Sequence, residues 1–517
     1  MTLAAPDFGE LVVDEPFFAP TPHGLIDGLF GQYRAMRARI ERLSTLMDAE
    51  NSMALGYFRI GNANDDHRFP AADRLFRVEP AIKALDADFW QRTLSMTDVY
   101  NAMPQKRRDE WNESIRKLKA PEFTEDNVRA TMETLLAARA QFLAERVDGI
   151  FRGLSGEHVT NSPMAFGKRM IVGYVFSQYG GARDSKAGLI NDLRCVIAKF
   201  MGRDEPRWNS SQRMLETCKA VHGVWHSLDA GALRIRCYLK GTAHLEVHPD
   251  MAWRLNAILH TLYPLAIPAN YRVKPPKQAK TFRMMGRPLP FAVLTILDDL
   301  RVQGCVATFG YASTDKASSK EVARVLESIG GVVAGGAVTF DYDPTEVLRE
   351  IRLSGCVPDR VSHQFYPTPE CVARVAVDMA RIGDGMTCLE PSAGQGGLAQ
   401  YLPASTLCVE ISELHCAILR EKGFAAECAD FIEWAQTWSR FDRVVMNPPF
   451  SEGRAFAHVE AASRLIAGGG RLVAILPASM RGKSILPGWS HEWSQVFDNK
   501  FAGTSTAVAI VAMERAA

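Results

Sequence analysis

The segment "RVVMNPPFSEG", residues 443–453, places an asparagine, two prolines and an aromatic ring directly after an apolar run. Proline has no N–H to donate to a sheet, so a strand over Val444–Met446 must end there. The Asn447 amide then offers hydrogen-bond acceptors and donors at a strand end, beside a rigid backbone and the Phe450 ring. Such a segment is either a stiff turn or a site, and the preceding segments decide between these interpretations.

A second segment with chemical potential is "CLEPSAGQGG", residues 388–397. A predicted buried strand ends at Glu390, and Gly394, Gly396 and Gly397 allow a tight turn and a close approach of the backbone to a ligand. A glycine loop alone is weak evidence, because many turns between strand and helix contain glycines for packing. The Glu-Pro at its start also makes it a poor pyrophosphate-binding loop.

Two further predicted strands end in acidic residues. "LCVEIS" ends in Glu410, at the position where an acidic residue usually accepts from ribose hydroxyls. "AECADFIEW" ends in Asp430 and Phe431, a carboxylate that can accept from an exocyclic amine, next to a ring. Each residue alone could be an ordinary cap or core group. Their joint occurrence at successive strand ends, before "NPPF", predicts one ligand site.

The elements that must position these residues alternate from residue 358 onward. Helices are predicted over 370–382, 396–402, 413–423 and 454–470, and strands over segments beginning at 386, 405, 425, 441 and 471, with a hairpin in "FAGTSTAVAIVAM". This alternation predicts a doubly wound, mostly parallel, Rossmann-like α/β sheet. In such a sheet, ligands bind at the carboxyl ends of the strands.

Residues 363–517 resemble the S-adenosylmethionine-dependent amino-methyltransferases of DNA, most closely the N6-adenine enzymes. "HQFYPTPECVARVAVDMA" is similar to their cofactor-binding segment, with Thr368 as N-cap and Pro369 as the first helical residue. The resemblance implies S-adenosylmethionine as cofactor and no metal. It assigns Tyr366, Thr368, Glu390, Ala393, Gly394 and Gly396 to the methionine part, Glu410 to the ribose, Ile411 to the adenine face, and Asp430 with Phe431 to the adenine amino group.

"NPPF" resembles the catalytic tetrapeptide of that family, in which an exocyclic amine attacks a sulfonium methyl group. The Asn447 side-chain oxygen and the Pro448 carbonyl would accept the hydrogens of the amine, and Pro449 would help to fix the direction of that carbonyl. Phe450 would stack on a base rotated out of the duplex, and Phe501 would form the other side of the base pocket. The resemblance therefore implies base flipping and transfer to adenine N6 in double-stranded DNA.

The same type of tetrapeptide occurs in enzymes that methylate RNA bases and in enzymes that methylate a glutamine amide of release factors. The motif consequently defines the reaction better than the substrate. A DNA-binding protein that retains the cofactor fold without catalysis is a further alternative, which the intact "NPPF" disfavours. We found no obvious nuclease constellation, so an orphan or mobile-element enzyme is expected rather than one with a known restriction partner.

The N-terminal half predicts two further domains. Residues 1–275 predict a mainly helical domain with a β-hairpin in "ALRIRCYLKGTAHLEVHPD", and residues 276–357 a small α+β connecting module before the methyltransferase domain at 358–517. In that module, Ser318 and Glu321 form a potential capping box, and Gly335-Gly336 predicts a hairpin turn. Helix followed by hairpin is compatible with a winged-helix reader, and also with many other α+β modules.

The target reader is expected within residues 1–357, because only 20 residues, Glu452–Arg471, separate "NPPF" from the next strand. Residues from about 80 to 270 resemble an uncharacterised domain found beside such enzymes in bacterial, plasmid and prophage proteins. The candidate phosphate contacts in this half, which are equally compatible with a solvated charged face, are Lys106, Arg107, Arg108, Lys168, Arg169, Lys274, Lys277 and Lys280.

The composition excludes several other classes. The ten cysteines include no C-x-x-C pair, and His244 and His248 lack a third ligand nearby, so neither a disulfide scaffold nor a metal site is expected. The N-terminus lacks a secretory signal pattern, and no apolar run approaches the length of about 18 residues that a membrane span needs. We expect a cytoplasmic bacterial protein, encoded by a plasmid or a phage. The oligomeric state stays open, with a homodimer among the options.

Overall fold

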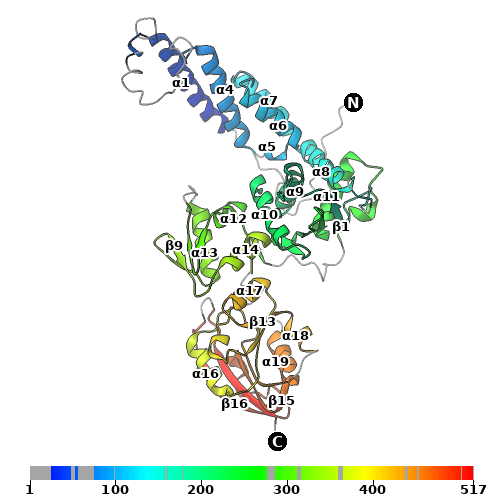
Figure 1. Ribbon diagram of the computed structural model, residues 1–517, viewed down its shortest axis with the longest axis vertical. Coiled ribbons are helices and arrows are strands. Elements are labelled where there is room, and N and C mark those ends of the chain that lie inside the picture. The colour runs from blue at the N-terminus through cyan, green and yellow to red at the C-terminus, as the bar shows by residue number, and fades with distance from the viewer. Residues whose placement is uncertain are drawn as a thin grey trace. The chain divides into compact units, whose positions relative to one another are not determined.

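A computed structural model describes residues 25–47, 53–55, 57, 75–97, 99–156, 158–159, 161–177, 180–275, 286–310, 316–358, 365–436, 440–450, 453–501 and 504–515. The chain divides into two compact units (Figure 1). One comprises Met1–Ser211 and Tyr238–Gln278, and the other Gln212–Cys237 and Ala279–Ala517. The segment Gln212–Cys237 therefore belongs to the second unit, although it lies inside the predicted 1–275 domain.

The first unit is mainly helical, as predicted. Its helices before the first strand are α1 (Leu25–Leu46), α4 (Val78–Ser95), α5 (Val99–Ala102), α6 (Gln105–Arg116), α7 (Glu125–Ala137) and α8 (Arg139–Ser155). Tyr33, Trp90 and Phe123 are buried together in its core. Asp86 is also buried there, and it accepts from the Tyr33 hydroxyl at 2.6 Å and from the Phe123 N–H at 3.2 Å. These bonds satisfy a carboxylate that burial would otherwise penalise.

The rest of the first unit combines a pair of strands with helices. Strand β1 (Arg169–Val172) pairs antiparallel with β4 (Ala243–Val247), and α9 (Asp184–Phe200), α11 (Pro249–Leu262) and η3 (Ala269–Tyr271) complete the set. The predicted turn before β4 is confirmed, since Tyr238 N–H donates to Thr242 O at 2.9 Å. His248 caps α11 by accepting from Asp250 N–H at 3.1 Å.

The second unit begins with short elements. They are the end of α10 (Trp208–Ala220), β2 (His226–Leu228), η2 (Asp229–Gly231), β3 (Leu233–Cys237), β5 (Arg287–Pro288), α12 (Phe291–Asp298), β6 (Arg301–Gln303), β7 (Val306–Thr308), α13 (Lys316–Ser328), β8 (Val332–Ala334), β9 (Ala337–Thr339), α14 (Thr345–Ser354) and β10 (Cys356–Val357). Strands β6, β7, β9 and β8 form one antiparallel sheet in that order. The predicted Gly335-Gly336 turn is confirmed, with φ of +57° and +85°.

One expectation for this module, the capping box at Ser318, was wrong. Helix α13 already includes Lys316, so Ser318 lies inside the helix and cannot be its N-cap. Hairpin β6–β7 separates α12 from α13, and hairpin β8–β9 separates α13 from α14. The expected order of helix and then hairpin is present in α13 and β8–β9, and the winged-helix interpretation stays a prediction.

The C-terminal part of the second unit is a seven-stranded sheet, drawn yellow to red in Figure 1. Its strands are β11 (Cys388–Pro391), β12 (Leu407–Glu410), β13 (Ala425–Cys428), β14 (Phe441–Met446), β15 (Ile466–Pro477), β16 (Trp489–Phe497) and β17 (Val508–Arg515). Their order is β13-β12-β11-β14-β15-β17-β16. The first five are parallel, and β17 runs antiparallel to both β15 and β16.

Helices cover both faces of this sheet. They are α16 (Glu370–Ala380), α17 (Glu413–Glu421), α18 (Phe431–Trp434) and α19 (Arg454–Arg464). Val445 packs in the core beneath α16, whereas its neighbour Val444 packs in the core beneath α19. Successive residues of a strand face opposite sides, so β14 is buried on both faces. The predicted doubly wound, mostly parallel α/β sheet is confirmed.

Three local predictions in this sheet were wrong. The expected helix over 396–402 is a single 3-10 turn, η4 (Ala399–Tyr401). The terminal hairpin exists, but its first strand is β16, upstream of the expected segment. That strand alternates exposed polar with half-buried residues at the sheet edge, so no apolar run marks it. Helix α16 begins at Glu370, with Pro369 rather than Thr368 as its N-cap.

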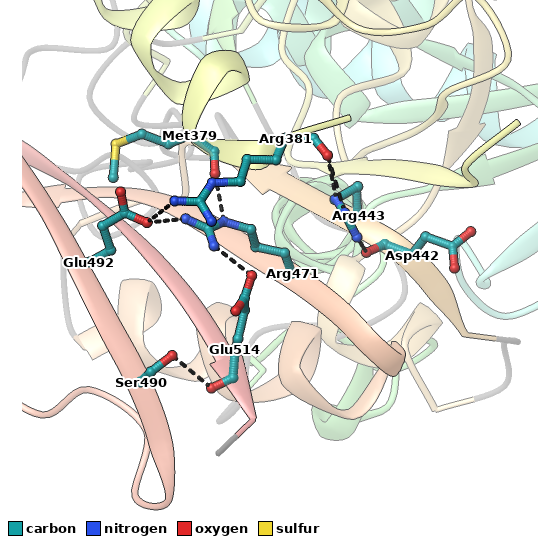
Figure 2. Close-up of polar contacts among 8 residues, drawn as sticks. All are labelled: Met379, Arg381, Asp442, Arg443, Arg471, Ser490, Glu492 and Glu514. Carbon is teal, nitrogen blue, oxygen red and sulfur yellow. Dashed lines mark hydrogen bonds and ion pairs between the residues drawn. The ribbon is translucent and has the colours of Figure 1, made fainter. Parts of the chain in front are cut away.

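The amino end of β14 carries a cluster of arginines and carboxylates (Figure 2). Arg471 is 3% exposed; it donates to Met379 O at 2.6 Å, to Glu514 at 2.5 Å, and also to Glu492. Arg443 donates twice to Arg381 O, at 3.1 and 3.2 Å. Because the last carbonyls of a helix lack partners within it, these two guanidinium groups complete the C-terminal end of α16.

No helix within the described ranges has the combination of length and hydropathy that crossing a membrane requires.

Candidate active site

The predicted strand-end residues lie at one edge of the sheet. Glu390 is in β11, Glu410 ends β12, Asp430 follows β13 and Asn447 follows β14. These four strands are neighbours and run parallel, so their carboxyl ends meet at the same edge. The structure thus brings together residues that are separated by up to 57 positions in the sequence.

The loop after β11 requires its glycines. Gly394 has φ of +57°, and a Cβ there would lie 2.7 Å from the Phe365 ring. Gly396 has φ of +83°, and a Cβ there would lie 2.9 Å from the Phe424 ring. Ala393 is buried, and its N–H donates to Val409 O at 3.1 Å. The loop is therefore fixed closely between its neighbours, and larger residues would displace it.

Glu410 is a buried carboxylate with several donors. Its oxygens accept from Gly394 N–H at 2.8 Å and from Ser412 N–H at 2.9 Å, and His415 Nδ1 lies 3.8 Å away. Burial opposes ionisation, but His415 and the two backbone donors outweigh it and lower the pKa of Glu410. An ionised carboxylate has about four acceptor sites, so Glu410 retains capacity to accept from hydroxyl groups.

Glu390 differs from Glu410 because one of its oxygens is not hydrogen-bonded. The residue is 2% exposed, and within the described part of the chain its Oε2 atom has no partner. Burial, followed by the charge of Glu410, raises the pKa of Glu390 well above its ordinary value. A buried acid that lacks a partner fits a bound cation, and an ammonium group would supply both the charge and the missing donor.

The third strand end is more open. Asp430 is exposed and caps α18 by accepting from Ile432 N–H at 2.9 Å. Ile411 is 47% exposed, as a residue that packs on a ligand ring must be before binding. Phe431, in contrast, is only 3% exposed and packs with Trp434 in the core. Phe431 therefore supports this edge from within.

Asn447 follows β14 directly and has a defined partner. Its Nδ2 atom donates to Thr368 Oγ1 at 3.1 Å. Thr368 is thus used to orient the asparagine, and this explains why the residue is not the helix cap that was expected. An amide that donates through its nitrogen presents its oxygen to another donor. Asn447 Oδ1 is accordingly the atom that can accept from a substrate.

The prolines and rings of the tetrapeptide are partly enclosed. Pro448 is buried, and Pro449 and Phe450 are half-buried. Phe450 packs against the cores on both faces of the sheet, and Tyr366 packs against the core beneath α16. Phe501 is 6% exposed in that same core, so little of its ring is presented to a ligand. Its assignment to the base pocket stays a prediction.

Sequence reasoning missed four residues of this edge. Ser392 Oγ lies 3.1 Å from His458 Nδ1, and the His458 ring packs 5.4 Å from the Phe431 ring. The Phe365 ring lies 4.4 Å from the His415 ring. One signal was visible for His458, which interrupts the apolar face formed by Ala455, Val459 and Ala462 on the helix after "NPPF".

The residues predicted to contact phosphates differ in their exposure and in their ion pairs. Arg108 pairs with Asp192 at 2.8 Å and is 12% exposed, and Arg169 pairs with Glu246 at 2.6 Å. The Arg107 guanidinium lies 5.3 Å from the centre of the Phe142 ring. Arg107, Lys168 and Lys274 are exposed, the side chain of Lys106 is not described, and Lys277 and Lys280 lie outside the described residues. Arg108 and Arg169 would have to leave carboxylates of their own unit to bind phosphate.

Among the residues that the structure describes, no three His, Cys, Asp or Glu side chains are grouped to hold a metal ion.

Comparisons with known proteins found one family for the N-terminal half of the chain. A family described as a domain of unknown function, DUF4942, matches residues 82–264, which is less than half of the chain. This range overlaps the segment that resembles an uncharacterised domain. No curated protein sequence matches the chain.

Several solved structures are similar to part of the chain. A precorrin-6y C5,15-methyltransferase from Geobacter metallireducens has 16% identity and a TM-score of 0.24, covering 28% of this chain and 89% of that chain. A putative RNA methyltransferase from Pyrococcus horikoshii has 19% identity and a TM-score of 0.26, covering 31% and 90%. TrmN from Thermus thermophilus has 14% identity and a TM-score of 0.26, covering 52% and 68%.

Similarity at this level carries no argument about the substrate. The fold is defined by the strand order of this chain, with five parallel strands followed by an antiparallel pair. The C-terminal part of the second unit has a doubly wound, Rossmann-like fold.

Proposed function

We propose that this protein transfers a methyl group from S-adenosylmethionine to the N6 amine of adenine in double-stranded DNA. The observation that supports this proposal most is the orientation of Asn447. Its amide nitrogen is held by Thr368 at 3.1 Å, at a strand end beside the β11 loop, so its oxygen is offered to an amine.

The residues at this edge fit the cofactor. Glu390 Oε2, buried without a partner among the described residues, would bind the ammonium group of the methionine part. Glu410, ionised at neutral pH, would accept from the ribose hydroxyls, and the exposed Ile411 would cover one face of the adenine. S-adenosylmethionine, when bound, supplies a methyl group on a positively charged sulfur, which is a strong electrophile.

The chain's own contribution to the reaction is to hold the amine. An aromatic amine is a weak nucleophile because its lone pair is delocalised into the ring. Asn447 Oδ1 and the Pro448 carbonyl would accept its two hydrogens and favour a tetrahedral nitrogen with a localised lone pair. Proline fixes the backbone on both sides of this carbonyl, so the acceptors need little reorganisation as charge develops.

The base must leave the duplex to reach this edge, because its amine is enclosed in the stack. Phe450 is half-buried and would stack on the rotated base. The exposed Arg107, Lys168 and Lys274 are candidates for contacts with the DNA backbone. All ten cysteines are free thiols, which suits the reducing cytoplasm that we propose as its location.

The test uses the full chain with radiolabelled S-adenosylmethionine and three separate acceptors: plasmid DNA, bulk RNA and release factors. We expect label in N6-methyldeoxyadenosine after digestion of the DNA to nucleosides. Label in N6-methyladenosine from RNA, or in a protein glutamine, would replace the proposed substrate. Cofactor binding without label in any acceptor would favour a non-catalytic role.

Asn447→Ala is the matched variant for this assay, and Asn209→Ala, at an exposed asparagine of α10, is its control. The first should abolish labelling while S-adenosylmethionine still binds. The second should leave labelling unchanged. Labelling that survives Asn447→Ala would contradict the assigned role.

A further inference from the structure

His458 lies where the segment after "NPPF" meets the loops of two other strand ends. It is on α19, whose first residue, Arg454, follows Phe450 by four positions. The side chain is 8% exposed, on the apolar face of that helix. Buried histidines are often ordinary core residues, so its two contacts decide whether it does more.

The first contact is with Ser392, which has an unusual backbone. Its φ is +65°, in the left-handed region that glycine tolerates and serine rarely adopts. Ser392 lies in the loop between Glu390 and Gly394, both assigned to the cofactor. A non-glycine residue keeps such a conformation only when its surroundings enforce it. The contact of 3.1 Å between Ser392 Oγ and His458 Nδ1 is a direct means of doing so.

The second contact is with Phe431, the residue after Asp430. The two ring centroids are 5.4 Å apart, with 43° between the ring planes. Burial lowers the pKa of His458, and the charge of Asp430 opposes this only in part. A neutral imidazole has one nitrogen that accepts a hydrogen bond, so Nδ1 can accept from the Ser392 hydroxyl group. One side chain thus contacts the loop after β11 and the first residue of α18, the helix that follows β13.

We propose that His458 is a positioning residue for the cofactor, which holds Ser392 in its left-handed conformation and supports Phe431 beneath Asp430. This inference rests on the proposed function, because it assumes that the edge binds S-adenosylmethionine. It goes beyond that function by giving a role to a residue that touches neither cofactor nor substrate. The loop after β11 is then shaped by the helix that follows the catalytic tetrapeptide.

The test compares variants that separate the hydrogen bond from the packing. His458→Phe keeps a ring against Phe431 but loses the bond, and His458→Asn keeps a polar group near the position of Nδ1. Ser392→Gly removes the need for enforcement, because glycine adopts positive φ without strain. If His458 acts through the backbone of Ser392, the glycine variant should make His458→Phe harmless.

The measurement is the dissociation constant of S-adenosylmethionine, by calorimetry on the full chain. We expect His458→Phe to weaken binding about tenfold, equivalent to about 1.4 kcal/mol, which is within the cost of one residue in a sparsely populated backbone region. His458→Asn should stay within about threefold of the unmodified chain. Adding Ser392→Gly to His458→Phe should restore binding to within about threefold of Ser392→Gly alone.

Val459→Ala is the control for general loosening of α19, because Val459 is fully buried next to His458. This variant should lower thermal stability and leave cofactor affinity unchanged. Unchanged affinity in His458→Phe would overturn the inference. Failure of Ser392→Gly to rescue His458→Phe, or a loss of kcat at unchanged cofactor affinity, would overturn it as well.

The outcome for the unmodified chain separates the two proposals. If the unmodified chain binds no S-adenosylmethionine, the proposed function fails, and the positioning role fails with it. If the unmodified chain binds S-adenosylmethionine and the His458 variants bind it equally well, only the positioning role fails.

Discussion

At the amino edge of the seven-stranded sheet, Arg471 donates to two carboxylates and a helix carbonyl (Figure 2). At the carboxyl edge, in contrast, Glu390 keeps a buried oxygen without a partner among the described residues. The amino edge also closes the end of α16 through Arg443. The carboxyl edge contains Ser392 with positive φ, and also Gly394 and Gly396, where a Cβ would lie within 3 Å of a neighbouring ring. The arginine cluster at the amino edge satisfies its polar groups from within, whereas Glu390 at the carboxyl edge keeps an oxygen prepared for a ligand.

This contrast has a general physical meaning. Buried polar groups in proteins nearly always have partners, so an exception requires an explanation. Strain and missing partners reduce stability, and they persist where a ligand supplies what is absent. The comparison therefore predicts that changes at the carboxyl edge affect binding and activity, while changes at the amino edge affect stability.

The largest effect is expected for Asn447→Ala at the carboxyl edge. Removing one oriented acceptor for developing charge should lower kcat about 100-fold or more. The midpoint of thermal unfolding should hardly change, because among the described residues the Asn447 side chain has one hydrogen bond, to Thr368. Steady-state kinetics on DNA and a thermal melt of the same samples test both statements. A large loss of stability with modest loss of kcat would reverse the assignment.

The next effect is expected for Arg471→Met at the amino edge. It leaves Met379 O and Glu514 without this donor, and it leaves Glu492 with Arg381 alone, which donates to it at 3.1 Å. Both carboxylates are about half exposed and can regain water, so we expect a loss of about 2 kcal/mol, below the range for fully buried pairs. Urea unfolding measures this. Cofactor affinity at low temperature should be unchanged.

Arg464→Met is the control for that prediction. Arg464 pairs with Glu460 at 2.7 Å, one helical turn away, and both side chains are more than half exposed. Exposed pairs of this type contribute about 0.3–0.5 kcal/mol. Equal destabilisation by Arg464→Met and Arg471→Met would contradict the special role of the amino edge.

A smaller effect is expected from Glu390→Gln, and it depends on pH. Folding raises the pKa of Glu390. The stability that the protonated Glu390 contributes is therefore complete below the pKa of the unfolded chain, about 4.3, and it decreases as pH rises toward the pKa of the folded chain. Glutamine cannot ionise. The stability of the unmodified chain should therefore fall relative to Glu390→Gln as pH rises above about 4.3. Urea titrations at several pH values measure the difference, and parallel curves would contradict the raised pKa.

The same substitution should weaken the cofactor. If an ammonium group binds ionised Glu390, binding releases a proton and affinity rises with pH in the unmodified chain. Glu390→Gln should bind more weakly, with a flatter dependence on pH. Calorimetry in buffers of different ionisation enthalpy measures the released proton. Identical proton release in both proteins would place the ammonium group elsewhere.

The strand ends of the site could be predicted because local signals mark them. Apolar runs that stop at Glu390, Glu410 and Asn447 are followed by proline, glycine or a capping serine, and these features act within a few residues. The doubly wound sheet follows from the same alternation. The order of the strands could not be derived in this way, since it depends on contacts between distant segments.

The missed features share a physical cause. Strand β16 has no apolar run because it lies at the edge of the sheet, exposed on one side. Thr368 was assigned to a helix cap from local pattern, whereas its hydroxyl serves Asn447, 79 positions away. His458 interacts with Ser392, 66 positions away. Each of these roles is created by tertiary contact, which single-sequence patterns do not record.

The most direct test of the contrast between the two edges is amide hydrogen exchange with and without S-adenosylmethionine. Peptides that cover 388–397 and 410–415 should become protected when the cofactor binds, and peptides that cover 468–473 and 512–515 should not change. Protection at the amino edge alone would contradict the assignment of the cofactor to the carboxyl edge. Protection in the first unit, without any protection of the β11 loop, would contradict it as well.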